Sequence, residues 1–407
     1  MQKTRPIGHV GPENGSLAAL GDFSLVAGGP LYRLLRRTRL SGDEMQWTVR
    51  RMVVLAVLAW VPLLLLSVID GRAWGSAVAL PFLHDLEVHA KLLIAIPLLI
   101  AAEVTAHRRL LPIVRQFLER DLIPETERPR FDAAIAAAMR LRGSVVAEML
   151  LIVFVYVVGV LFVWRTQSTL EISSWYADST GGSLHLSRAG WWAALVSLPL
   201  AQFLLVRWYF RLFIWGRFLL QVSRMRLNLM PTHPDGMAGL HFLGTSRRAF
   251  TQLLVAQGAV LSGMIANRIF YEGANLMSFK PELFGTVVVM VFAVLGPLLA
   301  FAPRLRKTRR RGMEECGALG QRYAREFDDK WLRGGAPPGE LLMGTADIQS
   351  LADLRNSFLV VRDIEFAPFT MKVVLSMAIT TLLPVAPLLL TMFSAEQLVE
   401  RVLKVLF

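Results

Sequence analysis

Residues 144–164 read SVVAEMLLIVFVYVVGVLFVW and contain a single charged side chain, Glu148. An apolar run of about 18 to 20 residues is long enough to cross the hydrocarbon core of a bilayer as a helix. Six other apolar stretches lie on either side of this one, and we expect all seven to form the spans of an all-α transmembrane bundle. In chain order the stretches are Met52–Ile69, Leu92–Ala106, Ser144–Trp164, Trp191–Ile214, Ala249–Asn267, Leu283–Pro303 and Met371–Phe393.

The composition excludes an ordinary soluble domain. Hydrophobic residues make up 54% of the 407 positions, and the formal net charge is +13. A basic balance can indicate nucleic-acid binding, but here the basic residues lie at span ends and in loops. Topology and contact with anionic lipid headgroups explain that distribution more simply. We therefore expect a multi-pass membrane protein with no nucleic-acid partner.

Lysine and arginine fall mainly in alternate loops. All but eight of the 44 lie in the N-terminal segment or in the second, fourth and sixth loops. The positive-inside rule assigns these segments to the cytoplasm, so we expect the N-terminus inside and the C-terminus outside. The abundance of arginine and alanine indicates a bacterial chain and hence the inner membrane. The first apolar run begins only at Met52, so we expect it to remain as an anchor.

The N-terminal segment, residues 1–40, has two predicted parts. Residues 1–29 are rich in Gly and Pro and are expected to be mostly disordered. Residues 30–40, PLYRLLRRTRL, predict a short basic amphipathic helix on the inner leaflet. The capping-box pattern from Ser41 to Glu44 then predicts the start of the membrane part, residues 41–303, which holds the first six spans and their cytoplasmic helix extensions.

Two further amphipathic segments follow the sixth span. Within residues 304–365, apolar residues recur at helical spacing on both sides of the turn GGAPPG, which predicts a cytoplasmic helical hairpin. The alternative is that both helices lie on the inner leaflet. Residues 366–393 then carry the seventh span. Residues 394–407 predict an amphipathic tail that rests on the outer leaflet or on a neighbouring subunit.

Charged side chains inside a span are costly in hydrocarbon, so each one is a candidate functional residue. Glu103, Glu148, Arg207 and Arg211 fall near the expected inner ends of the second, third and fourth spans. Arg207 and Arg211 are four residues apart and share a helix face, where they could meet both carboxylates. One interpretation is a polar cavity open to the cytoplasm, such as an ion vestibule or an anion site. The other is structural pairing of side chains that reach water.

The fifth span is polar on all sides. Gln252, Gln257, Ser262 and Asn267 follow one another at five-residue intervals, so at about 100° per residue they point in four directions. Such a helix cannot face lipid, and its small residues at four-residue spacing favour close helix contacts. We expect it at the centre of the bundle, where these side chains either line a pathway or form interhelical hydrogen bonds.

The loop between the fourth and fifth spans contains His233, Pro234 and Asp235, followed by His241. The tripeptide resembles the signature of J-domain co-chaperones, although a membrane span precedes it here in place of the first J-domain helix. A metal site formed by these residues, or a membrane enzyme that uses His233 and Asp235, is a further hypothesis. We favour a sharp turn in which the prolines stop one helix and Asp235 caps the next.

Other chemical signatures are sparse. On the expected outer side, Asp85 and His89 stand one turn apart and could share a proton or a divalent ion, but a polar interfacial turn explains them equally well. No Walker loop, nucleophile elbow, H-E-x-x-H pair or CxxC occurs in a usable context, so neither a cofactor nor a metal is predicted. Cys316 is the single cysteine, which excludes an intramolecular disulfide.

Two segments, RMRLNLMPTHPDGMAGLHFLG at residues 224–244 and ADLRNSFLVVRDIEFAPF at residues 352–369, resemble uncharacterised bacterial membrane proteins of similar length. The resemblance covers roughly the C-terminal half of the chain and implies no activity. Seven spans with an inward N-terminus, an outward C-terminus and a cytoplasmic helical layer are also similar in topology to insect chemoreceptor channels. That similarity carries no shared motif and transfers no functional residue.

These patterns lead to two functional hypotheses. The first is a channel or ligand-responsive pore lined by spans five and seven, where Pro384 and Pro387 predict a kink or gating element. The alternative is a non-transporting sensor or scaffold that docks a soluble protein through the hairpin. The expected partners are the bilayer, its anionic inner-leaflet lipids and further copies of the chain in a homo-oligomer.

Overall fold

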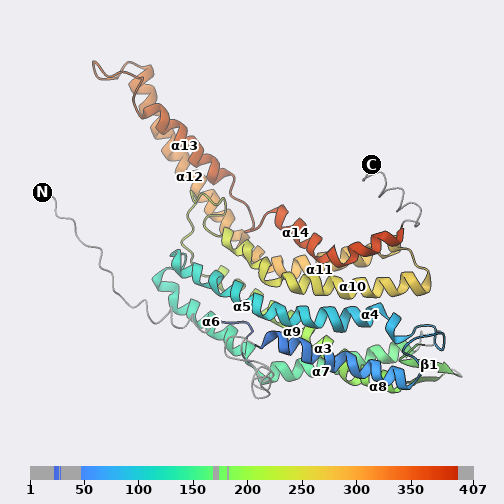
Figure 1. The fold of residues 1–407 in the computed structure, drawn as a ribbon. Helices are drawn as coiled ribbons and strands as arrows, with labels where there is room; N and C mark the ends of the chain where they lie inside the picture. Colours follow the sequence, from blue (N-terminus) through green and yellow to red (C-terminus); the bar gives the residue numbers. More distant parts are fainter. Residues whose placement is uncertain (1–22, 27, 29–46, 168–173, 181–182, 393–407) are drawn as a thin grey trace.

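The structure is a computed structural model and describes residues 23–26, 28, 47–167, 174–180 and 183–392. These residues form a helical bundle with one short strand pair, which confirms the all-α class (Figure 1). The predicted amphipathic helix at residues 30–40, the capping box from Ser41 to Glu44 and the predicted tail at residues 394–407 lie outside the described residues.

Helices make up most of the described chain. The α-helices are α3 (Thr48–Ile69), α4 (Leu86–His89), α5 (Ile96–Glu119), α6 (Arg128–Arg142), α7 (Val145–Gln167), α8 (Arg188–Trp192), α9 (Leu198–Ser223), α10 (Thr251–Glu272), α11 (Lys280–Leu295), α12 (Ala302–Phe327), α13 (Asp347–Arg362) and α14 (Met371–Leu382). Several continue into 3-10 or π-helical turns, including Ala90–Ala95 before α5, Ala193–Ser197 before α9, His241–Phe250 before α10, Gly296–Phe301 before α12 and Leu383–Met392 after α14. The strands β1 (Ala177–Thr180) and β2 (Ser183–Leu186) pair antiparallel.

Six of the described helices are long and apolar enough to cross a membrane, as expected for a multi-pass membrane protein. The predicted third span is different, because α6 and α7 form a pair bent by 46° that counts as a seventh candidate only when taken together. The six helices are Thr48–Ile69, Leu86–Glu119, Arg188–Ser223, His241–Glu272, Leu276–Leu332 and Met371–Met392.

The helix α10 lies inside the bundle. Of its most apolar window, 61% is buried, compared with 17% for α3. It packs against α4, α5 and α14. Two glycines allow this close approach, because a Cβ on Gly258 would lie 1.9 Å from the carbonyl oxygen of Thr381, and a Cβ on Gly263 would lie 2.7 Å from the Cβ of Ala90. The small residues of the fifth span therefore serve as helix contacts.

The helix α9 is a second central helix, in addition to α10. It packs against α6, α7 and the Gly296–Phe301 turn, and more lightly against α5. At one end Ser197 donates to the carbonyl of Ala59 in α3 at 2.6 Å. At the other end Arg304, in the first turn of α12, donates to the carbonyls of Ser223 and Arg224 at 3.2 and 2.9 Å. These donors satisfy carbonyls at the C-terminus of α9 that have no partner within the helix.

A core of aromatic rings fills the end of the bundle at which α5 ends and α12 leaves, which we call the basic end. The ring of Phe117 lies 5.9 Å from Phe131 and 5.2 Å from Phe242, and the ring of Phe218 lies 5.8 Å from Phe23. Phe23 is only 1% exposed, and the buried residues Leu25 and Val26 extend the same core. Residues 23–26 are thus packed, which corrects the expectation of disorder for this part of residues 1–29. Three neighbouring apolar side chains can be buried despite the flanking glycines.

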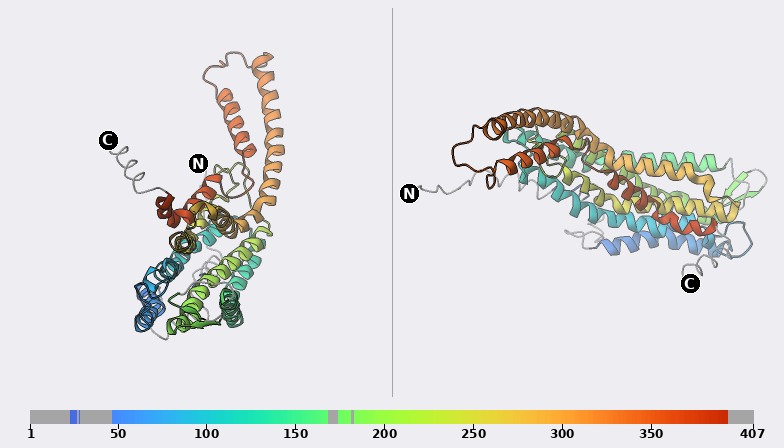
Figure 2. Two further views of the ribbon diagram at one scale, coloured as in Figure 1. Left: turned by 90° about the vertical axis from the view of Figure 1, so that its right-hand side faces the viewer. Right: turned by 90° about the horizontal axis from the view of Figure 1, so that it is seen from above.

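The hairpin between the sixth and seventh spans projects from the basic end as an arm (Figures 1 and 2). The arm is α12, the π-helical turn Asp328–Leu332 and α13, which packs against α12 along the predicted apolar positions. At its far end Asp347 accepts hydrogen bonds from Lys330 at 3.0 Å and from the indole of Trp331 at 2.9 Å. These contacts hold the start of α13 against the end of α12.

The opposite end of the bundle carries the strand pair, which the sequence patterns did not predict. Trp175 and Phe82 are both buried there, with ring centroids 5.1 Å apart. The indole of Trp175 donates to Asp85 at 2.8 Å, and Ser187 caps α8 by accepting from the N–H of Gly190 at 2.9 Å. These contacts fasten the segment before α8 to the start of α4.

Candidate functional site

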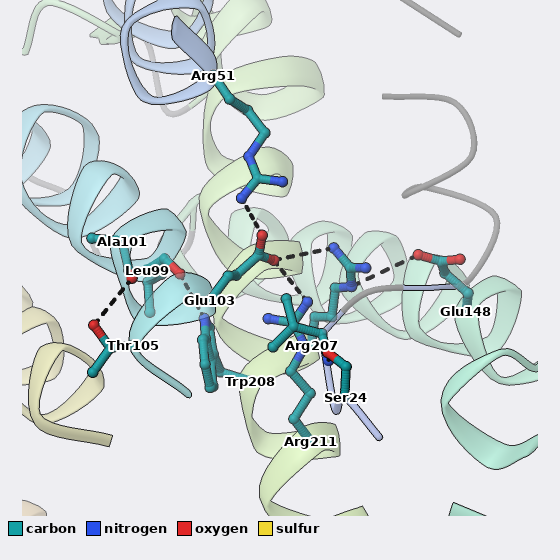
Figure 3. Close-up of polar contacts among 11 residues, drawn as sticks. Ser24, Arg51, Leu99, Ala101, Glu103, Thr105, Glu148, Arg207, Trp208 and Arg211 are labelled. Atoms are coloured by element: carbon teal, nitrogen blue, oxygen red, sulfur yellow. Dashed lines mark hydrogen bonds and ion pairs between the residues drawn. The ribbon is translucent and has the colours of Figure 1, made fainter. Parts of the chain in front are cut away.

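A cluster of five charged side chains lies inside the bundle near the basic end, and Figure 3 shows its contacts. Glu103 of α5 is at its centre. It accepts from Arg51 of α3 and, at 2.7 Å, from Arg211 of α9, while an Nη of Arg207 lies 3.6 Å away. The Nε of Arg207 lies 3.8 Å from Glu148 of α7. The cluster therefore joins four helices that are distant in sequence.

Every side chain of this cluster is buried. Glu103 is 4% exposed and Arg211 is 3% exposed, and the most exposed member, Glu148, reaches only 9%. Three arginines face two glutamates, so the cluster carries one excess positive charge when all five are ionised. Buried charges persist only when they are paired and hydrogen-bonded, because the desolvation cost is several kcal/mol per ion. Glu103 meets that requirement, because it accepts hydrogen bonds from both Arg51 and Arg211.

Two neighbouring contacts orient the arginines. The guanidinium of Arg211 lies 4.8 Å from the ring centroid of Trp208, which suits a cation–π contact. The indole N–H of Trp208 donates to the carbonyl of Leu99 in α5 at 2.8 Å. The ring is thereby fixed between α5 and α9, and Arg211 is held toward Glu103.

The structure brings together all four charged residues that the sequence singled out in the spans, and it adds Arg51. Arg51 lies just before the first apolar run. Because the segment before that run is rich in basic residues, the sequence alone offers no reason to expect a specific partner for Arg51. Arg51 is buried on the same side of α3 as Ala59, Leu63 and Ser67, which are spaced four residues apart. The small residues Ala59 and Ser67 on that face are the signal that could have revealed Arg51 as a fifth member.

The polar side chains of α10 are distributed among four different neighbours. Gln252 donates to Thr105 of α5 at 2.8 Å, and Gln257 accepts from Tyr209 of α9 at 3.3 Å. Ser262 donates to the carbonyl of Pro384 at 2.8 Å. Asn267 donates to Asp85 at 2.8 Å. This arrangement matches the interhelical hydrogen bonding that the sequence left open beside a lining role.

The prolines of the seventh span coincide with a change of helix type. The α-helical part of the span ends at Leu382, and the 3-10 segment that follows contains Pro384 and Pro387. The carbonyl of Pro384 accepts the hydroxyl of Ser262, so α10 is bonded to the span at this point. The change of helix type is therefore stabilised by α10, which also approaches the seventh span closely at Gly258.

The loop between α9 and α10 is organised around Asp235. Its Oδ1 accepts from the backbone N–H groups of Met237 and Gly239 at 2.9 and 3.0 Å, and its Oδ2 accepts from the N–H of His241 at 3.1 Å. Burial alone would raise the pKa of Asp235, but these donors, together with nearby His233, outweigh it and lower the pKa. Asp235 thus accepts from the first N–H of the His241–Phe250 helix, which agrees with the cap that the turn interpretation predicts. The other part of that interpretation is wrong, because α9 ends at Ser223, before the prolines that were expected to stop it.

The two histidines of this loop both contact Asp235. The Nδ1 of His233 lies 3.0 Å from Oδ1 of Asp235 and 3.2 Å from its backbone nitrogen. His241 contributes its backbone N–H to Asp235. Among the described residues, no group of three or more His, Cys, Asp or Glu side chains could hold a metal ion.

Asp85 and His89 have separate partners at the opposite end. Asp85 caps α4 by accepting from the N–H of Val88 at 3.1 Å and also accepts from Trp175 and Asn267. His89 lies between the indole N–H of Trp60 and the carbonyl of Leu83, each at 3.2 Å. The polar interfacial turn therefore describes this pair better than a shared proton or ion.

Two hollows stand out among the described helices. The larger has a volume of about 600 Å³, opens between α3, α7 and α9, and is almost wholly apolar apart from Glu148 and Tyr156. The smaller has a volume of about 60 Å³ and lies between α5, α9 and α10. Neither is lined by residues of the seventh span.

Comparisons of the chain with protein-family models, with curated proteins and with solved structures find no match.

Proposed function

We propose that this chain is a multi-pass protein of the bacterial inner membrane that acts as a scaffold or sensor and docks a water-soluble protein through the arm. The positive-inside rule assigns the arm to the cytoplasmic side. The observation that carries the proposal is the apolar surface at the tip of the arm, which projects away from the rest of the helical bundle (Figure 1).

The tip combines several large apolar side chains that have no cover in the described chain. Leu332, Leu341 and Met343 are 72%, 75% and 90% exposed, and Ile348 is 51% exposed. They lie at the end of the π-helical turn Asp328–Leu332, in the connecting loop and at the start of α13. Large apolar side chains exposed together at one end of an element are typical of a protein or membrane interaction site.

The charge of the arm favours a protein over the lipid surface. From Gly312 to Val361, eight acidic residues stand against five basic ones, whereas Arg304 to Arg311 carries six basic residues and no acidic one. The basic base of the arm fits anionic headgroups, and the acidic remainder is repelled by them. The partner that fits the tip is a soluble protein with an apolar groove bordered by basic residues.

A pore lined by α10 and the seventh span remains a prediction, and the geometry supports it less. The polar groups of α10 that were expected to line a pathway are engaged by α5, α9, Pro384 and Asp85. Neither hollow lies between α10 and the seventh span. Interhelical hydrogen bonds of this kind stabilise a packed core without a permeation path.

The docking proposal can be tested with a photoreactive amino acid at Met343 in the full-length protein, in inside-out membrane vesicles supplied with cytosol. We expect one soluble protein to crosslink from Met343. Gln321 is exposed on the same arm and serves as the matched control, from which that adduct should not form. Leu341→Glu should abolish the adduct, because it places a charge in the apolar surface.

Three results would contradict the docking proposal. Adducts to lipid alone would place the tip on the membrane. Adducts to a second copy of the chain alone would make the arm an oligomer contact. Equal adducts from Met343 and Gln321 would show chance collision.

A variant that lacks Gly312–Val361 should keep a folded membrane bundle, since Gly312 and Val361 are the only buried residues of this segment.

A further inference from the structure

The larger hollow is a groove on the outside of the membrane bundle. Its walls come from α7 and from the Ala193–Ser197 turn and α9, and Leu58 of α3 completes it. Met149 and Ile152 line one wall, and Leu200 and Phe203 line the other. At the far end the hydroxyl of Tyr156 donates to the carbonyl of Leu195 at 3.2 Å and closes the groove.

The length of the groove corresponds to one leaflet of a bilayer. Its lining on α7 runs from Val145 to Tyr156, which at 1.5 Å per residue is about 17 Å. Half of the hydrocarbon core of a typical bilayer is about 15 Å. The groove is therefore long enough to hold one acyl chain that enters from the basic end.

The entrance of the groove is polar and carries both signs of charge. Glu148, in the first turn of α7, lines the groove itself. Arg207 follows the groove residue Phe203 by one turn on the same face of α9, and its Nε lies 3.8 Å from Glu148. Among the described residues Arg207 has ion pairs only at 3.6 and 3.8 Å, both longer than a hydrogen bond. Its N–H donors are thus available to an anionic group.

We propose that the groove binds a phospholipid of the surrounding bilayer whose headgroup carries a primary ammonium next to its phosphate. The acyl chain fills the apolar groove, the ammonium donates to the carboxylate of Glu148, and the phosphate accepts from Arg207. A carboxylate beside a guanidinium matches this dipolar headgroup. A headgroup with only a negative charge would meet Glu148 with repulsion, and a choline headgroup has no N–H to donate.

The headgroup preference of the wild-type protein provides a test that needs no substitution. The purified full-length protein in mild detergent is titrated with phosphatidylethanolamine, phosphatidylcholine or phosphatidylglycerol of identical acyl chains, and bound lipid is counted by native mass spectrometry. We expect retention of phosphatidylethanolamine to exceed that of the other two by about tenfold, the ratio expected for one charge-assisted hydrogen bond.

Three variants separate headgroup recognition from simple filling of the groove. Glu148→Gln should remove the preference for phosphatidylethanolamine over phosphatidylcholine. Ile152→Trp should lower the retention of all three lipids, because the indole occupies the groove. Val153→Trp is the matched control, since Val153 is the next residue on α7, is 58% exposed and does not line the groove. Its lipid retention should equal that of the wild type.

Several outcomes would overturn the proposal. Equal retention of the three lipids by the wild type would mean that the groove only dissolves acyl chains. A preference for phosphatidylglycerol would show that the arginines alone select the headgroup. A lipid-free dimer that crosslinks through Met149 would show that a second copy of the chain fills the groove.

Discussion

Asn267 of α10 donates from its Nδ2 to Oδ1 of Asp85 over 2.8 Å, and its Oδ1 accepts from the N–H of Leu86 at 2.9 Å. One amide thus joins the end of α10 to the start of α4. We expect Asn267→Ala to lower the free energy of unfolding by about 1–3 kcal/mol, because the substitution removes both hydrogen bonds, one of them to the buried carboxylate of Asp85. Thermal unfolding in detergent measures this loss. A change in ion flux at unchanged stability would instead favour a lining role for Asn267.

Removing Glu103 should be more damaging. Without it, three buried arginines share only Glu148, and an uncompensated buried charge costs about 3–5 kcal/mol. We therefore expect Glu103→Gln to unfold at a much lower denaturant concentration than the wild type. The double variant Glu103→Gln with Arg51→Gln should recover part of the loss, because it removes one of the uncompensated charges. Strict additivity of the two single effects would contradict a coupled cluster.

Gly258 is a position at which α10 and α14 approach each other closely. Because any Cβ there would meet the carbonyl oxygen of Thr381, Gly258→Ala should cost about 1–3 kcal/mol, as for other overpacked cores. Gly285→Ala in α11 is the matched control, since a Cβ at that position would have no packing neighbour within 4 Å. That control should be neutral or slightly stabilising, since alanine favours a helix. Equal effects of the two substitutions on thermal unfolding would contradict the close approach.

The Asp235 cap predicts a pH dependence of defined sign. The pKa of Asp235 in the folded protein is lowered from an ordinary value of 3.8, so the carboxylate stabilises the fold when ionised. This contribution is fully present above the ordinary pKa and is lost as the pH falls through the lowered pKa. The stability advantage of the wild type over Asp235→Asn should therefore shrink in thermal unfolding as the pH falls from about 5 to about 2. A constant advantage over that range would contradict the cap.

The expected orientation can be tested through cysteine accessibility. Cys316 is the single cysteine and is partly buried, so the variant Cys316→Ser with Gln321→Cys gives one exposed thiol on the arm. A membrane-impermeant maleimide should label it in inside-out vesicles and leave it unlabelled in intact spheroplasts. The reverse pattern would place the arm outside the cytoplasm and would exclude a cytoplasmic docking partner.

Much of the fold was readable from apolar periodicity, because the hydrocarbon core demands long uninterrupted helices. The helix extensions expected for the spans are present after the second span, because α5 continues to Glu119 and α6 begins at Arg128. The structure places a bend between α6 and α7 that periodicity does not reveal. The burial of Phe23 was also missed, because a short apolar run without helical spacing gives no signal of where it packs.

The candidate site was predicted in part. Glu103 and Arg211 stood out because hydrocarbon makes each buried charge conspicuous. Arg51 did not, since a basic residue at the end of a span usually reaches water. The partner of Asp85 was equally hidden, because Trp175 lies 90 residues away and the fold alone brings its indole to the carboxylate.

The helix that runs from Leu276 to Leu332 has 57 residues and, at 1.5 Å per residue, a length of about 85 Å. Its first part is apolar enough to span a membrane, and its last part forms one side of the arm. A helical segment of this length acts as a lever, in which the displacement of the free end grows with distance from the pivot. Changes in bilayer thickness tilt membrane helices at modest cost. A thinner or thicker bilayer that tilts α11 therefore also moves the tip.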